Sequence, residues 1–322
     1  MTYQLTVIPI DRSSLPKLPA WVTSTRAETP EYMAFLSGAS FAILDTLLCQ
    51  SNDAVPMTLL ANTLALRAAV ATSKLEGRMA TEADIRDAYY LTPPGDDGIR
   101  HRGPDGEVLD YWRNTVHLRL GHADWMRAIA DTIHERFEDA VETWLKTAVD
   151  RSRSEGPLAA ATRIMRDVLE ADDRAERVAC LLSDVVLARF FGWEHPLPLT
   201  ALHLSKSNLR DLKEGTGEPA VHRAIMQSAQ KTYRLATTLA ARAEALRAIT
   251  PKLRTRGSED AVALFLREDA VAPSSMLAPT IRGTTTSMTA RAARRFCDRL
   301  VELGVARELT GRSTFRLYGI AS

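Results

Sequence analysis

Five arginines near the C-terminus are the residues of this sequence best suited to binding chemistry. Three share one short segment and two follow a glycine-containing turn; they are Arg291, Arg294, Arg295, Arg312 and Arg316. A guanidinium group presents a planar fork of N–H donors, which binds a phosphate, or the O6 and N7 atoms of guanine, through two hydrogen bonds. The pattern therefore predicts contacts with DNA.

The same arginines also fit a simpler interpretation. On a helix, Asp298 and Glu302 would lie about one turn from neighbouring arginines and would pair with them, leaving an ordinary solvated face. A module of this kind can also bind another protein or a second copy of the chain. DNA binding and these two alternatives stay open at this point.

The segment with the first three arginines has the pattern of an amphipathic helix. Thr286 or Ser287 is a suitable N-cap, and Gly304 is a suitable C-terminal stop. At about 100° per residue, six apolar side chains fall on one face, opposite the arginines. They are Ala292, Ala293, Phe296, Cys297, Leu300 and Leu303.

Two strand-like runs end the chain. They are Val305–Leu309 and Thr314–Tyr318, joined across a turn that needs Gly311. Upstream, SEDAVALFLRED predicts a short amphipathic helix and APSSMLAPTIRG a further helical turn. The order helix, helix, turn, helix and hairpin is that of a winged helix-turn-helix, whose last helix enters the DNA major groove in most known uses. We expect residues 251–322 to form such a domain.

The charge distribution supports a separate role for this segment. Residues 251–322 carry 12 Lys and Arg against 7 Asp and Glu, whereas residues 1–250 carry 29 against 33. The net charge of +1 therefore hides a basic end of +5 on a body of −4. Such a split favours a polyanionic partner for the basic end, although +5 is modest beside strongly basic nucleic-acid binders.

Residues 1–250 have the pattern of a helical bundle. Apolar residues recur at helical spacing from Pro30, from Val55 and along Ala220–Ile249, with further helices expected at Thr81–Leu91, Val108–Leu120, Ala123–Val149, Leu158–Ala171 and Arg174–Phe191. Thr81 is a suitable N-cap for its helix, since Glu82 and Asp84 follow in the first turn. Residues 92–107 predict a surface loop, and a break is expected near 150–157. The predicted fold class is all-α: a multi-helix bundle with a C-terminal winged helix-turn-helix that carries a short β-hairpin.

Signatures of cofactor and metal chemistry are missing from the sequence. No GxGxxG, GxxxxGK[ST] or GxSxG occurs, His117 and His122 are five residues apart, and HERFE lacks the second histidine of HExxH. We expect no cofactor and no metal. The cysteines, Cys49, Cys180 and Cys297, are expected to be buried thiols, and Trp112, Trp125, Trp144 and Trp193 to belong to the core.

The N-terminal sequence bears on localisation. MTYQLTVIPIDRSSLP lacks the basic start and the small-residue cleavage site of a signal peptide, and no apolar run approaches about 18 residues. We expect a cytoplasmic protein without membrane contact.

The chain resembles the bacterial family DUF1403, a family of unknown function, over nearly its whole length. The resemblance runs through LPAWVTSTRAETPEYMAFLSGASFAILDTLL, DAYYLTPPGDDG and FGWEHPLPLTALHL to RRFCDRLVELGVARELTGRSTFRLYGI. Membership of this family implies kinship and no established activity.

A second resemblance, to Fic-domain proteins, concerns two segments. TSKLEG is similar to their inhibitory-helix pattern [ST]xxxE[GN], which places Thr72, Glu76 and Gly77 on it, and the final segment is similar to the winged helix that closes many of them. Fic enzymes transfer AMP through a segment of the form HPFxxGNGRxxR, which is missing here. EHPLPLTALHLSKSNLR offers only His195 and Pro196 and has no glycine turn to hold phosphate.

These observations predict a DNA-binding or regulatory protein that acts through its C-terminal unit. Two alternatives remain. One is an interaction scaffold, with a protein partner or as a homodimer. The other is a degenerate Fic-like nucleotidyltransferase, for which Glu76 and His195 are the weak catalytic candidates. Each of these residues also has a simpler interpretation: Glu76 as a helix-end carboxylate paired with an arginine, and His195 as a hydrogen-bonded structural histidine.

Overall fold

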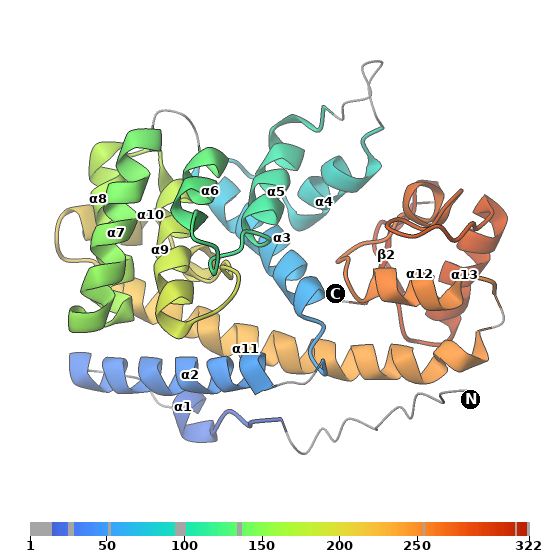
Figure 1. Cartoon of the computed structure of the whole chain (residues 1–322), viewed down its shortest axis with the longest axis horizontal. Coiled ribbons are helices and arrows are strands. Elements are labelled where there is room, and N and C mark those ends of the chain that lie inside the picture. Colours follow the sequence, from blue (N-terminus) through green and yellow to red (C-terminus); the bar gives the residue numbers. More distant parts are fainter. Residues whose placement is uncertain are drawn as a thin grey trace.

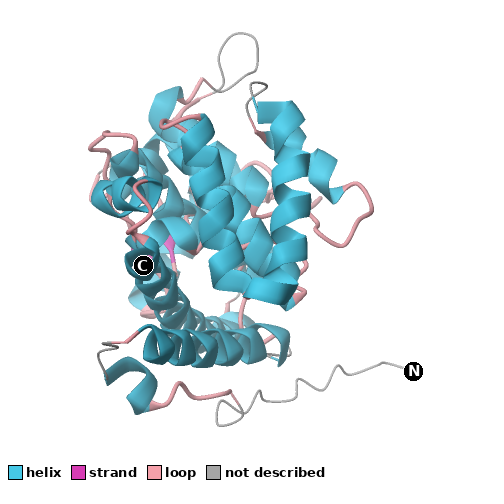
Figure 2. Cartoon of the chain, turned by 90° about the vertical axis from the view of Figure 1, so that its left-hand side faces the viewer, coloured by secondary structure: helices cyan, strands magenta, loops and turns pink. Residues whose placement is uncertain are grey.

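The computed structural model describes residues 15–24, 29–50, 53–93, 101–133, 137–253, 255–312 and 314–320. Helices dominate them, and the two strands pair with each other in one small sheet (Figure 2). In chain order the elements are α1 (Ala20–Ser24), α2 (Pro30–Gln50), α3 (Met57–Leu75), α4 (Glu82–Leu91), α5 (Gly103–Thr115), α6 (Trp125–Thr132), α7 (Glu138–Glu155), α8 (Pro157–Ala171), α9 (Glu176–Phe191), η3 (Thr200–His203), α10 (Lys206–Lys213), α11 (Glu218–Ile249), η4 (Thr250–Lys252), α12 (Ser258–Phe265), η5 (Pro273–Leu277), α13 (Ala290–Glu302), β1 (Arg307–Glu308) and β2 (Tyr318–Gly319). The expected all-α class is confirmed.

Helix α11 runs along the long axis of the molecule and extends from one end of the molecule to the other (Figure 1). Near one end α2 lies beside it, and the side-chain amide of Gln230 donates to Ser40 Oγ at 3.1 Å. Towards the other end Arg242 donates to the backbone oxygen of Ile320 at 2.7 Å. The 32 residues of α11 thus connect the helical body to the C-terminal residues 251–320.

Helix α2 is the one described helix that is long and apolar enough to cross a membrane by length and composition alone, with a mean hydropathy of 1.5 over Pro30–Cys49. The sequence alone does not reveal it, because polar residues interrupt its apolar run. One such helix is weak evidence, since a core helix passes the same test. In this fold Leu36, Leu44 and Leu47 of α2 are fully buried.

Some helix ends follow the sequence, and others do not. Thr81 caps α4 through a reciprocal pair of hydrogen bonds with Asp84, as expected. By contrast, α5 already begins at Gly103, inside the expected loop, because Pro104 and Asp105 suit a first helical turn. The break near 150–157 shrinks to Gly156.

The helix expected over Ala123–Val149 is divided in two. Helix α6 ends at Thr132, and Ile133 is extended, with ψ at 153°. The apolar stripe continues into α7, which is why its spacing resembles that of one helix. Residues 134–136, and 94–100 of the expected loop, lie outside the described residues.

The core contains most of the residues assigned to it. Trp112, Trp125 and Trp193 are buried, and Trp144 packs on the same cluster while partly exposed. Cys180 and Cys297 are buried thiols, but Cys49 is exposed, so the expectation for that cysteine is wrong. It lies in the last turn of α2, beyond the part of the helix that is covered.

The C-terminal residues combine three helical segments with a small antiparallel hairpin. In β1 and β2, Arg307 pairs with Gly319 and Glu308 with Tyr318. Val271, between α12 and η5, also exchanges two backbone hydrogen bonds with Tyr318, at 2.7 and 3.0 Å. The strands are shorter than the expected runs because Phe315 has a φ of 56° and interrupts the second one.

A buried ion cluster joins these residues to the body. Arg113 of α5 binds the carboxylates of Glu268, at 2.7 Å, and Asp269, and it also contacts the hydroxyl of Tyr90. That hydroxyl donates to Asp269 at 2.7 Å. All four side chains are buried or nearly so, and the apolar residues of both parts form one continuous cluster.

Arg113→Met tests this junction. The substitution keeps an aliphatic stem and leaves Asp269 buried without its cation, so we expect unfolding free energy to fall by about 3–5 kcal/mol in chemical denaturation. Arg119→Met is the control, since Arg119 is exposed and its distance to Glu194 is 3.8 Å. Equal midpoints for the two variants would contradict a structural role for the cluster.

Asp184 of α9 holds the segment before η3. Its Oδ1 accepts hydrogen bonds from the backbone nitrogens of Leu199, at 3.0 Å, and Thr200, at 2.9 Å. Its Oδ2 has no partner among the described residues. Burial raises the pKa of Asp184 to about 8, even though these hydrogen bonds lower it.

Asp184→Asn should therefore flatten the dependence of stability on pH. The carboxyl ionises above about pH 4 in the unfolded chain but only near pH 8 in the folded one, so the wild type loses stability as the pH rises through this window. The loss relative to the variant is on the order of 5 kcal/mol at the upper end. Urea titrations at several pH values measure it; parallel curves for the two proteins would refute the assignment.

Candidate nucleic-acid interface

Helix α13 presents three of the predicted arginines to solvent. Its buried face consists of Ala293, Phe296, Cys297 and Leu300, and Phe296 packs against Phe265 of α12 with ring centroids 6.3 Å apart. Ala292 is only partly buried, and Leu303 is 37% exposed just after the last helical residue, so the expectation for Leu303 is wrong. Arg291, Arg294 and Arg295 are exposed, and none has an ion pair with another residue that the structure describes. Their fork-shaped donors are thus available to an external acceptor.

The start of α13 differs from the expectation. Thr289 is the N-cap, and its hydroxyl accepts from the backbone nitrogen of Ala292 at 3.2 Å; Thr286 and Ser287 precede it. Thr286 instead bonds to Asp260 of α12. Arg291 therefore lies in the first turn, where the unpaired backbone N–H groups also favour an anion.

Arg312 and Arg316, the predicted wing residues, are more constrained. Arg312 Nη2 lies 3.0 Å from Oδ2 of Asp87 in α4, so Arg312 forms an ion pair with the helical body. Arg316 donates from Nε to the backbone oxygen of Arg312 at 3.0 Å, and its Nη1 is 3.9 Å from Asp298. Both remain exposed, yet neither is as free as the arginines of α13.

The turn of the hairpin is organised by one carboxylate. Glu308 accepts from the backbone nitrogens of Thr310, at 2.8 Å, and Gly311, at 2.9 Å, and from the Thr310 hydroxyl. Gly311 has the positive φ expected of it, 63°. Burial raises the pKa of Glu308, but these hydrogen bonds outweigh it and bring the pKa below the ordinary value, so the turn is held by an ionised group at neutral pH.

A groove of about 490 Å³ separates α13 from the second half of the hairpin. It is lined by Pro273, Ser274, Arg294, Asp298, Thr314, Phe315, Arg316 and Tyr318. Guanidinium groups from both walls can bind phosphate, while Asp298 is occupied by the Tyr318 hydroxyl at 2.9 Å.

Phe315 is a candidate that the sequence analysis missed. Its side chain is 71% exposed on the rim of this groove, and a ring in that position can pack on a base or a sugar. Strict strand alternation would have placed it inside with Leu317. Only the positive φ turns it outward, and nothing in the residue type announces that conformation.

Glu76 has a structural role in this fold. Its carboxylate binds Arg177 of α9 through two hydrogen bonds, at 2.9 and 2.7 Å, and Arg78 at 3.2 Å. Thr72 also has its hydrogen bonds within the protein, because its hydroxyl donates to the backbone oxygen of Ala68 and accepts from the indole nitrogen of Trp112. The pairing of this helix-end carboxylate with an arginine, which the sequence suggested, is present in the structure.

His195 lies elsewhere. Its Nδ1 is 3.0 Å from the backbone oxygen of Leu118, and the ring lines a pocket of about 380 Å³ together with His117 and Cys49. Burial lowers the pKa of His117, with further lowering by Arg113 and His195. None of the contacts described joins His195 to Glu76, so the structure does not assemble the two weak catalytic candidates.

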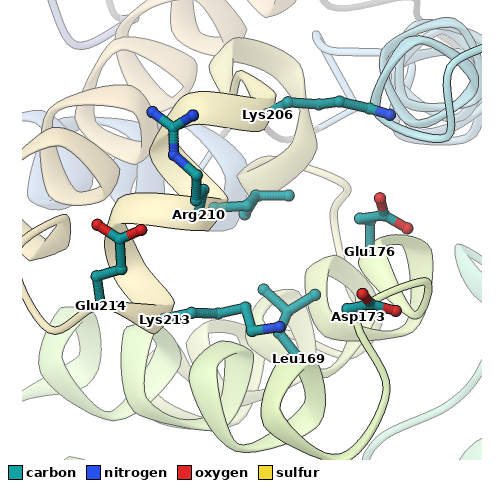
Figure 3. A pocket seen from close by; sticks show the side chains of 8 residues that line it. Leu169, Asp173, Glu176, Lys206, Arg210, Lys213 and Glu214 are labelled. Carbon is teal, nitrogen blue, oxygen red and sulfur yellow. The ribbon is translucent and has the colours of Figure 1, made fainter.

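A further hollow lies beside α10 (Figure 3). Lys206, Arg210 and Lys213 come from α10, and Asp173 and Glu176 from the junction of α8 and α9 across the hollow. Glu214, at the end of α10, also lines it, so three basic and three acidic side chains balance in charge. This hollow, of about 370 Å³, therefore offers less selectivity for an anion than α13 does.

Glu76→Gln tests the structural role of that carboxylate. Removing its charge leaves Arg177 and Arg78 with a weaker acceptor, so we expect unfolding free energy to fall by about 1–3 kcal/mol in denaturant titrations. Glu194→Gln, at an exposed position with a loose ion pair, serves as the matched control. An unchanged midpoint for Glu76→Gln would argue against this role.

Comparisons with known proteins give one match. Residues 8–320 match the model of a family described as "Protein of unknown function (DUF1403)". No curated protein and no solved structure matches the chain. The resemblance seen in the sequence is confirmed over nearly the whole chain, whereas the resemblance to Fic-domain proteins stays a prediction.

Proposed function

Starting from the fact that the chain belongs to the DUF1403 family, whose description names no activity, we propose that residues 251–320 form a winged helix that binds double-stranded DNA. In this proposal α13 is the recognition helix, and the hairpin of β1 and β2 is the wing. The helical body then carries or regulates this binding unit.

The order and pairing of the elements support the proposal. A winged helix has a short strand between its first two helices, and that strand joins the hairpin that follows the third helix. Here Val271 follows α12, precedes η5 and bonds to Tyr318 of β2. Antiparallel pairing of β1 with β2 completes the pattern.

The observation that carries the proposal is the free arginine face of α13. Four buried side chains fix that helix to the unit, so the opposite face, with Arg291, Arg294 and Arg295, is held outward. A helix of this length fits a major groove about 12 Å wide, where a guanidinium group can bind guanine with two hydrogen bonds. Arg299 contributes less, because Glu302 pairs with it at 2.9 Å.

The experiment is a fluorescence-anisotropy titration of the full chain on a DNA duplex of mixed sequence. We expect Arg291→Ala/Arg295→Ala to weaken binding by tenfold or more and to lower the slope of log affinity against log salt by about 1 for each phosphate that the variant no longer binds. The matched control is Arg210→Ala/Lys213→Ala, which removes the same charge from α10.

The outcomes separate the proposal from its alternatives. Weak binding that is the same for all three proteins and insensitive to salt would refute DNA binding. A stable complex with another protein or a second copy, without DNA affinity, would favour the interaction scaffold instead.

A further inference from the structure

An apolar pocket of about 420 Å³ lies at the other end of the molecule from α13. Its walls come from α2, the junction of α7 and α8, the end of α9 and the first turns of α11. Phe41, Phe190, Phe191, Met33 and Leu158 supply much of the surface. The volume and this lining are typical of a site for a small organic molecule.

Two buried polar groups in this pocket lack partners. Ser37 is 1% exposed, and its hydroxyl has no hydrogen bond to any described residue, not even to the preceding helical turn. His222 Nε2 is likewise buried and unpaired. Buried polar atoms normally find a partner, because an unpaired one has lost its hydrogen bonds to water without replacement. Two such atoms in one pocket indicate a ligand that supplies the missing bonds.

The chemistry of the pocket restricts that ligand. Among the residues that the structure describes, no Lys or Arg lines it, and the one carboxylate there, Glu155, pairs with Arg163 at 2.9 Å. Burial lowers the pKa of His222, which keeps the ring neutral at neutral pH, although Glu218 and a backbone bond with Leu158 raise it. Nε2 of a neutral imidazole accepts a hydrogen bond in one tautomer and donates one in the other.

A hydroxyl group can donate as well as accept, so it is complementary to the Ser37 hydroxyl and to Nε2 of His222 in either tautomer. Both atoms are covered in this structure, so the two side chains turn about their side-chain bonds to reach the ligand. We propose that this pocket binds an uncharged apolar molecule with one hydroxyl group, of the alkylphenol or aliphatic alcohol class, held by Ser37 and His222.

A substitution at Gly38 tests the pocket, because a larger side chain at this position would fill it. A Cβ placed on Gly38 meets nothing within 4 Å, and the residue lies in the middle of α2. A larger side chain there enters the pocket and also favours the helix over glycine. Gly38→Leu thus removes the cavity without removing a native side chain.

The test is calorimetric titration of the full chain with three probes: para-butylphenol, butylbenzene and para-butylbenzoate. We expect saturable binding of the phenol, roughly three- to tenfold weaker binding of the hydrocarbon, and the weakest binding for the anion. Ser37→Ala should weaken binding of the phenol by the same factor and leave the affinity for the hydrocarbon unchanged. Gly38→Leu should abolish all binding, while Thr46→Leu, on α2 outside the pocket, should bind like the wild type.

Three results would overturn the inference. They are equal affinity for the phenol and the hydrocarbon, phenol binding that survives Gly38→Leu, and the absence of saturable binding in the wild type. Self-association that Gly38→Leu abolishes, with no probe bound, would show that a second copy covers this face instead. If Gly38→Leu fails to fold, the comparison of phenol and hydrocarbon in Ser37→Ala still decides the question.

Discussion

The buried cation of Arg113 constrains the architecture more than any single apolar contact. A guanidinium group removed from water needs charged and polar partners, and here Glu268, Asp269 and Tyr90 supply them from two distant parts of the chain. The cluster has this geometry only when residues 251–320 lie against α4 and α5. The direction in which α13 presents its arginines is therefore set by a pairing on the opposite side of the same unit.

Because of this junction, the boundary between residues 250 and 251 does not separate two independently packed parts. In the sequence the boundary marks a change of pattern and of charge. In the structure Asn62 of α3 also donates to the backbone oxygen of Arg267 at 2.7 Å, and Arg86 of α4 to that of Leu309 at 3.0 Å. Together with the shared apolar cluster, these bonds make the C-terminal unit part of one packed structure.

The sequence predicted what depends on local periodicity and failed where distant residues decide. The apolar face of α13 follows from helical spacing, and the Thr81 cap follows from a local motif, so both were foreseen. Partners more than a hundred residues apart, such as Arg113 with Asp269, leave no periodic trace. The exposed position of Phe315 depends on a backbone angle, and the pocket at Ser37 depends on the packing of four elements; neither is visible in composition or spacing.

Helix α11 carries His222 of the pocket in its second turn and Arg242, bonded to Ile320, in its last third. The two candidate sites thus share one continuous helix, but a shared helix alone does not couple them. A ligand shifts DNA affinity only if it binds two arrangements of the protein with different affinity. An arrangement that moves residues 255–312 as a unit relative to α5 must first separate Arg113 from Asp269, at a cost of several kcal/mol. The geometry therefore favours a rigid body in which pocket and arginine face act independently, unless a ligand stabilises an arrangement in which this ion cluster is open.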